Sequence, residues 1–101
     1  MYKVVHTQEF TEWLSGLKDR MVRVRLTKRL RKATLGNLGD VKQVSAKVWE
    51  MREFFGAGWR MYYARQGDVL IVMLGGGDKS TQTVDIARAI ELAEILAEEE
   101  S

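Results

Sequence analysis

The chain has 101 residues, of which 46% are hydrophobic, 30% are charged and none is cysteine. This length suits one compact domain, residues 1–101, that buries a core without disulfides, and the lack of cysteine excludes thiol nucleophiles and cysteine-bound zinc. The single histidine cannot make a metal site alone, no apolar run reaches the roughly 18 residues that span a bilayer, and the start of the chain lacks an apolar signal-peptide core. We therefore expect a soluble, cytoplasmic domain without a metal.

The first part of the chain predicts one short strand and two helices. Residues 2–5 predict the strand, and Thr7 is the expected N-cap of a helix with apolar side chains at helical spacing, namely Phe10, Trp13, Leu14 and Leu17. Asp19 is expected to cap a second helix that ends near Leu35, before a glycine-rich stop. Because the link between the helices is short, they should form an antiparallel pair. The apolar stripe of the second helix is Val22, Leu26, Leu30 and Ala33.

From Asp40 onward the pattern predicts strands. Residues 41–44 form the first, and residues 48–55 and 58–65 flank a glycine-bearing turn, which predicts a β-hairpin. Centring this hairpin on Gly56 places Arg52 opposite Arg60. The same register pairs Glu50 with Tyr62 on the arginine face and Met51 with Met61 on the other face. Like charges in facing positions weaken a sheet, so the paired arginines indicate a compensating anion.

The last strand and a final helix complete an α+β fold. Residues 68–74 are apolar on both faces, which predicts an inner strand covered by helices on at least one side. We expect the glycines at 75–77 to end this strand and Ser80 or Thr81 to cap the helix. The core-facing stripe of that helix is predicted to be Ile86, Ile90, Ala93 and Ala97.

Residues 18–32 are strongly basic, with Asp19 as their one acidic residue. A helix built only for solubility usually interleaves both signs, so the pattern favours binding of a polyanion with release of its counterions. The ordinary alternative is a solvated helix face. Together with two cations near the sheet, the candidate RNA-binding residues are Lys18, Arg20, Arg23, Arg25, Lys28, Arg29, Arg31, Lys32, Lys47 and Arg65.

The facing arginines of the hairpin have two possible roles. A structural role would pair Arg52 and Arg60 with Glu50 or Glu53 on a half-exposed sheet. Lys47, Arg65 and Lys79 are expected to add further positive charge at this end of the sheet. Because cations outnumber glutamates here, we prefer the second role, bidentate binding of a phosphate. Tyr62 lies on the same face and is a candidate for stacking or proton transfer. The opposite face carries Trp49, Trp59 and Tyr63, which we expect in the core.

Three strings in the second half resemble one protein family. They are Trp49-Glu50-Met51-Arg52, Gly58-Trp59-Arg60-Met61-Tyr62-Tyr63, and Leu74-Gly75-Gly76-Gly77-Asp78-Lys79-Ser80-Thr81-Gln82 with Asp85-Ile86 after it. They resemble the addiction-module killer proteins, phage-related members of the RelE/ParE toxin superfamily close to HigB-type toxins. The resemblance spans almost the whole chain. It implies a small RelE-like fold, in which an N-terminal strand and a helical hairpin pack on a mainly antiparallel sheet, with a C-terminal helix added.

The resemblance also implies a function. Such toxins cleave mRNA, usually on the ribosome, use no metal or other cofactor, and are silenced by a cognate antitoxin that is often a helix-turn-helix protein. Their chemistry is attack of a ribose 2′-hydroxyl on the adjacent phosphate, which needs a proton acceptor, a proton donor and cations around phosphorus. Several relatives place a catalytic tyrosine or histidine near the C-terminus, where this chain has neither, so the general base stays unassigned. The candidate catalytic residues are Arg52, Arg60, Tyr62, Lys79 and Glu50.

Two other functions remain open. The same fold is used by ParE-like proteins, which are non-enzymatic poisons of DNA gyrase, and a missing general base favours that alternative. The chain could also be an inactive domain whose basic helix binds an acidic segment of an antitoxin. An antitoxin partner is expected under all three hypotheses.

Overall fold

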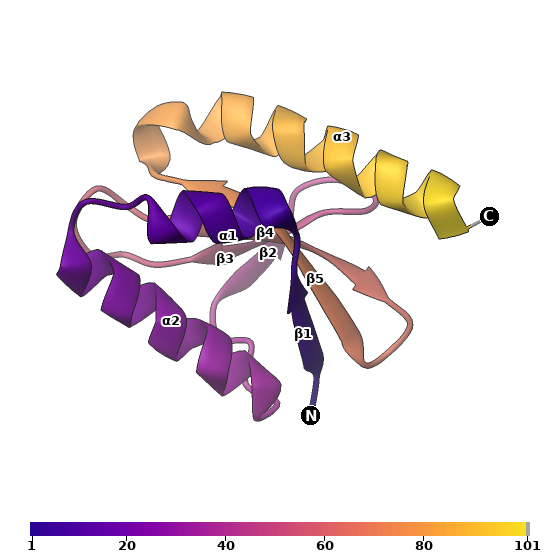
Figure 1. Cartoon of the computed structure of the whole chain (residues 1–101), viewed down its shortest axis with the longest axis horizontal. Coiled ribbons are helices and arrows are strands. Elements are labelled where there is room, and N and C mark those ends of the chain that lie inside the picture. The colour runs from indigo at the N-terminus through magenta and orange to yellow at the C-terminus, as the bar shows by residue number, and fades with distance from the viewer. Residues whose placement is uncertain (101) are drawn as a thin grey trace.

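A computed structural model describes residues 1–100 of the chain, which form a five-stranded sheet with helices on both faces (Figure 1). The predicted α+β class and the predicted order of helices and strands are confirmed. The elements are β1 (Lys3–His6), α1 (Gln8–Ser15), α2 (Arg20–Thr34), β2 (Val41–Gln43), β3 (Trp49–Arg52), β4 (Arg60–Gln66), β5 (Leu70–Gly77), the short 3₁₀ helix η1 (Lys79–Thr81) and α3 (Gln82–Glu100).

The strand order of the sheet is β1-β5-β4-β3-β2. β1 pairs with β5 in parallel, and every other neighbouring pair is antiparallel. β5 is therefore an inner strand, as its continuous apolar run predicted. No helix within residues 1–100 is both long enough and apolar enough to cross a membrane.

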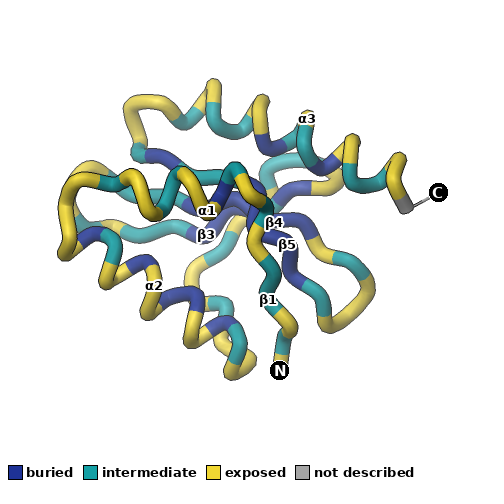
Figure 2. The backbone as a smooth tube through the Cα atoms, in the orientation of Figure 1, coloured by how far each residue is buried: buried dark blue, intermediate teal, exposed yellow. Residues whose placement is uncertain are grey.

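Helices cover both faces of the sheet, and each face has its own apolar core. α1 and α2 pack on one face, where the predicted α2 stripe of Val22, Leu26, Leu30 and Ala33 is buried against β3, β4 and β5. α3 packs on the other face through Ile86, Ile90 and Ala93, and through Ala89, which the pattern missed. Figure 2 shows the buried residues concentrated in the central strands and on the inner sides of the helices.

Capping residues begin the helices where short polar side chains were expected, with one exception. The Thr7 hydroxyl accepts a hydrogen bond from the Phe10 amide at 3.1 Å, and the Asp19 carboxylate accepts one from the Met21 amide at 2.9 Å. The exception is the final helix, for which the prediction of Ser80 or Thr81 was wrong. A 3₁₀ turn precedes α3, so the cap lies earlier, at Asp78, whose carboxylate accepts the Ser80 amide at 2.8 Å.

The glycines of β5 belong to the strand, so the prediction that they end it was wrong. Gly75–Gly77 pair with Arg60–Tyr62 of β4. A Cβ atom at Gly76 would overlap the ring of Trp13, and one at Gly77 would overlap the carboxylate of Asp85. Glycine is needed here because a helix approaches the strand closely on each face.

One buried arginine of α2 joins several loops to the sheet. The guanidinium of Arg29 donates to the carbonyls of Leu38 (3.1 and 2.9 Å), Asp40 (2.6 Å) and Arg52 (2.8 Å), and to the carboxylate of Glu53 (2.9 Å). A guanidinium has five N–H donors, and these bonds use all of them. Arg29 therefore fixes the end of β3 and the segment that precedes β2 relative to α2.

The substitution Arg29→Met should lower the free energy of unfolding by about 3 kcal/mol, because it leaves buried carbonyls and the Glu53 carboxylate without their donor. Urea unfolding measures this loss. Arg31→Met is the matched control, since Arg31 is exposed on the same helix and a surface change is usually within about 0.5 kcal/mol. Equal losses in the two variants would contradict the role of Arg29.

Candidate active site

The β3–β4 hairpin pairs in the predicted register. Arg52 lies opposite Arg60, Glu50 opposite Tyr62, and Met51 opposite Met61. The two arginines occupy the ends of their strands that adjoin the turn at residues 53–59. The hairpin therefore brings two guanidinium groups to one end of the sheet.

Each of these arginines is held by one carboxylate, which reduces their mutual repulsion. Arg52 donates to Asp40 at 3.0 Å, and the Nε atom of Arg60 lies 3.6 Å from a Glu50 oxygen. The arginine side chains are 31% and 13% exposed, respectively. The Nε atoms of both arginines are buried, so a ligand cannot reach them. One terminal nitrogen of each arginine already donates, to the Asp40 carboxylate at 3.0 Å from Arg52 and to the Gly58 carbonyl at 2.6 Å from Arg60. The other terminal nitrogen of each guanidinium is the donor that a phosphate oxygen could accept.

Glu50 and Tyr62 do not face solvent, so the prediction that they lie on an exposed substrate face was wrong. Tyr62 is 0% exposed and Glu50 is 1% exposed. Both are covered by the N-terminal part of α3, where the Gln82 amide donates to Glu50 at 3.0 Å. The alternation of the strand placed these side chains on the correct face, and the packing of α3 buries that face.

Burial, with a further contribution from the nearby Glu50 carboxylate, raises the pKa of Tyr62 well above its ordinary value. The phenol therefore stays protonated near neutral pH. A protonated phenol cannot accept a proton from a ribose hydroxyl, although it can donate one. Of the two roles considered for Tyr62 in proton transfer, only that of a donor is compatible with this environment.

Lys79 lies beside Arg60, on η1. The Lys79 amide donates to the Ala57 carbonyl at 3.2 Å, which docks η1 on the β3–β4 turn. Gly58, with a φ of +75°, lies between these two residues, since a Cβ atom there would be 3.1 Å from the Arg60 guanidinium and 3.4 Å from the Lys79 Cβ atom. We call Arg52, Arg60 and Lys79 the cationic end of the sheet.

Lys47 and Arg65 lie far from this end, contrary to the prediction that they add to the same cationic cluster. Arg65 is five residues along β4 from Arg60, which is about 17 Å in an extended strand. The Arg65 guanidinium lies 5.4 Å from the centre of the Tyr2 ring. Lys47 and Arg65 line a separate cavity of about 140 Å³ beside the C-terminal half of α3.

The basic residues at 18–32 divide into two groups. Arg29 is buried and fully hydrogen-bonded, so it is a structural residue and not an RNA-binding candidate. The others are exposed or half-exposed, and within residues 1–100 none of them has an ion-pair partner within 4.0 Å. These solvent-facing cations are Lys18, Arg20, Arg23, Arg25, Lys28, Arg31 and Lys32.

Sequence reasoning missed Gln82 and Asp85, which support the site from α3. Gln82 bonds to Glu50, and Asp85 accepts the Thr81 hydroxyl at 2.5 Å while packing against Gly77. Both lie in the first turn of α3, and their spacing of three residues places them on one face of that helix. That spacing could have indicated that they face the arginine strand. No group of three or more His, Cys, Asp or Glu side chains in residues 1–100 is arranged to hold a metal ion.

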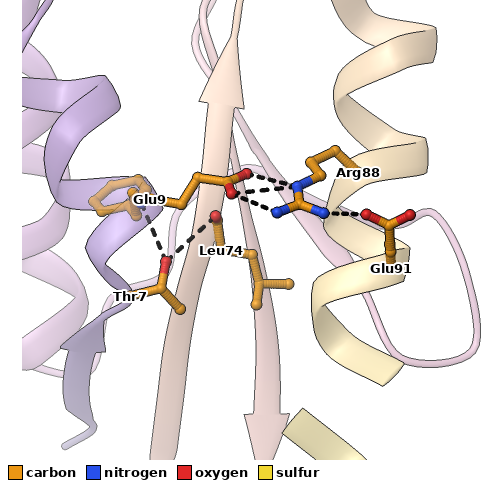
Figure 3. Close-up of polar contacts among 6 residues, drawn as sticks. Thr7, Glu9, Leu74, Arg88 and Glu91 are labelled. Carbon is orange, nitrogen blue, oxygen red and sulfur yellow. Dashed lines mark hydrogen bonds and ion pairs between the residues drawn. The ribbon is translucent and has the colours of Figure 1, made fainter. Parts of the chain in front are cut away.

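An ion-pair bridge joins α1 to α3 beside β5 (Figure 3). Arg88 of α3 donates to both carboxylate oxygens of Glu9 in α1, at 2.8 and 3.0 Å, and also pairs with Glu91. Its hydrogen bonds lower the pKa of Glu9. Close to this bridge, the Thr7 hydroxyl donates to the Leu74 carbonyl at 3.4 Å. The bridge links the two helical layers next to the glycine segment of β5.

The sequence profile of the phage-derived Gp49-like proteins (DUF891) matches residues 12–98, which include the whole cationic end and the basic helix. The chain belongs to this family. A curated relative, an uncharacterized protein of Haemophilus influenzae, is 41% identical over 90 residues, which are 89% of this chain and 91% of that protein. No solved structure gives a significant match. The Gp49-like proteins are a toxin-like family related to RelE and addiction modules, so the resemblance is confirmed at that level.

In this Gp49-like protein, Tyr62 should make the fold sensitive to alkaline pH. Its pKa is raised in the native state, so the native protein keeps a proton that the unfolded chain loses above about pH 10. The free energy of unfolding should therefore fall as pH rises through that range, and Tyr62→Phe should flatten the fall.

This pH dependence is measured from the urea concentration at the midpoint of unfolding, at several pH values between about pH 8 and about pH 11. Tyr63 also has a raised pKa, so the single substitution should remove only part of the decline. Tyr2→Phe, at a half-exposed tyrosine on the other side of the molecule, is the control. If the alkaline slopes of wild type and Tyr62→Phe coincide, the assigned environment of Tyr62 is incorrect.

Proposed function

We propose that this Gp49-like protein is the toxin of a type II toxin–antitoxin system and that it acts in the cytoplasm as an endoribonuclease on mRNA, in association with the ribosome. The observation that carries the proposal is the pair of facing arginines, Arg52 and Arg60, with Lys79 beside them. Their charges are only partly compensated by Asp40 and Glu50. Such a group of donors fits a phosphodiester, which arginine binds in a bidentate manner.

The proposed reaction is attack of a ribose 2′-hydroxyl on the adjacent phosphate, with release of the 5′-oxygen of the next nucleotide. Negative charge builds up on the phosphoryl oxygens as this bond forms. Arg60 and Arg52 would stabilise that charge, and Lys79 would contact the phosphate from η1. Glu50 lies close to Arg60 and is itself held by Gln82, so we assign it a positioning role.

The proton acceptor in this reaction follows from what the site exposes. Glu50 is buried, Tyr62 is protonated and Lys79 acts here as a cation, which leaves the RNA itself among the groups considered. A site of this kind would rely mainly on electrostatic stabilisation. Because a single phosphate-stabilising donor is typically worth about 10²- to 10³-fold in rate, such an enzyme can be slow and still be toxic.

The burial of Glu50 and the protonation of Tyr62 also favour a second candidate, a ParE-like poison that binds DNA gyrase without cleaving RNA. This function needs no general base. It predicts growth arrest with intact mRNA and a DNA-damage response. An antitoxin partner is expected for either candidate, because the family is toxin-like.

Arg60→Ala should abolish growth arrest on induction and reduce RNA cleavage by about 10²- to 10³-fold, since it removes one of the two guanidinium groups that are proposed to donate to the phosphate. Northern analysis of a defined mRNA measures the cleavage. Lys3→Ala is the matched control, because Lys3 is an exposed cation that pairs with Leu70 at the opposite end of β5 from Gly77, the partner of Arg60.

Arg60→Ala also leaves the buried Glu50 without its cation, so its folding must be checked by circular dichroism. Arg60→Lys keeps the charge and loses the bidentate geometry, and it should therefore fold and retain a small part of the activity. Full toxicity and full cleavage in a folded Arg60→Ala protein would overturn the assignment of Arg60.

A further inference from the structure

The β3–β4 turn carries a strongly exposed aromatic ring next to the cationic end of the sheet. Phe54 is 78% exposed, and the Arg52 guanidinium lies 5.8 Å from the centre of its ring. A single exposed apolar side chain is common on protein surfaces and needs no function by itself. The surroundings of Phe54 are therefore what decides its role.

Cations lie on both sides of this turn. On one side, Arg60 donates to the Gly58 carbonyl at 2.6 Å, and a Cβ atom at Gly58 would lie 3.4 Å from the Lys79 side chain. On the other side, α2 approaches, with the Arg25 guanidinium 4.5 Å from the centre of the Phe55 ring. The turn thus connects the cationic end of the sheet to the basic residues of α2, and along the chain Phe54 lies between Arg52 and Phe55, which contacts Arg25.

A cavity of about 260 Å³ lies where α2 meets the turn, and its charge is strongly positive. Glu53 is its one acidic lining residue, and the Arg29 guanidinium already neutralises it at 2.9 Å. Three further cations in the lining have no ion-pair partner within residues 1–100. They are Arg25, Lys28 and Lys32. An anionic ligand is the natural occupant of this cavity.

We infer that the β3–β4 turn and the adjacent cavity form a binding subsite for single-stranded RNA. One base stacks on Phe54, and the neighbouring backbone phosphates lie against Arg52 on one side and against the α2 cations on the other. Single-stranded RNA fits because its bases can leave their stack and present a face to an aromatic ring, whereas paired bases cannot. The inference rests on the proposed function, since it names how the substrate strand is held beside the cationic end.

Binding is tested separately from cleavage with a 2′-O-methylated single-stranded oligonucleotide, which cannot undergo attack by its own 2′-hydroxyl. Fluorescence anisotropy with the full chain gives the affinity. Phe54→Ala should weaken binding about 10-fold, and Phe54→Trp should retain it, because stacking needs only an aromatic face. The same RNA strand in a duplex should bind wild type and Phe54→Ala equally.

Leu35→Ala is the matched control, because Leu35 is an exposed apolar residue at the end of α2. The double substitution Lys28→Ala, Lys32→Ala tests the cavity. It should reduce the slope of log affinity against log salt by about 1.4, given about 0.7 per phosphate contact of a single strand.

Unchanged affinity of Phe54→Ala for the single strand, or an equal loss for the duplex, would overturn the inference. Binding of a polyglutamate peptide in place of the RNA would also overturn it, in favour of an acidic protein partner. If the protein binds the oligonucleotide as described but cleaves no RNA, the subsite stands and the proposed endoribonuclease function fails.

Discussion

The hydrogen bonds of Arg29 are the constraint on which the candidate site depends. By binding the Arg52 carbonyl, this side chain fixes the end of β3 at the point where the facing arginines begin. By binding the Asp40 carbonyl, it also fixes the residue whose carboxylate holds the Arg52 guanidinium. The guanidinium packs against Gly39, which has a φ of +70°, and a Cβ atom there would overlap it. A basic residue that looks suited to RNA thus acts inside the protein.

The layer formed by α3 determines which groups of the site can meet a substrate. It buries Glu50 and Tyr62. It leaves Arg52 partly exposed and Lys79 exposed to solvent. The result is a site rich in donors and poor in accessible proton acceptors. Such a site stabilises the charge of a phosphate more readily than it activates a hydroxyl. For this reason the same geometry is also compatible with the second candidate function, a poison that does not cleave RNA.

Local patterns in the sequence predicted much of this fold. Thr7 and Asp19 cap their helices through side-chain contacts that span only a few residues, and the position of Gly56 was enough to set the hairpin register. The failures depend on tertiary contacts. The glycines of β5 are part of the strand, at positions where Trp13 and Asp85 approach the backbone too closely for a side chain. The charge pattern of α2 grouped Arg29 with the solvated cations, although its guanidinium is buried. Neither contact is visible in the spacing of residues.

The central claim is that the cationic end of the sheet promotes 2′-hydroxyl attack on mRNA, and the chemistry of the new RNA ends tests it most directly. Total RNA from cells that express the protein would be ligated to a 5′ adaptor with and without prior phosphorylation, then sequenced. Attack by the 2′-hydroxyl releases the 5′-oxygen unphosphorylated, so discrete new ends should be captured only after phosphorylation, and not with the Arg60→Ala protein. New ends that already carry a 5′-phosphate, or intact mRNA in arrested cells, would contradict the claim.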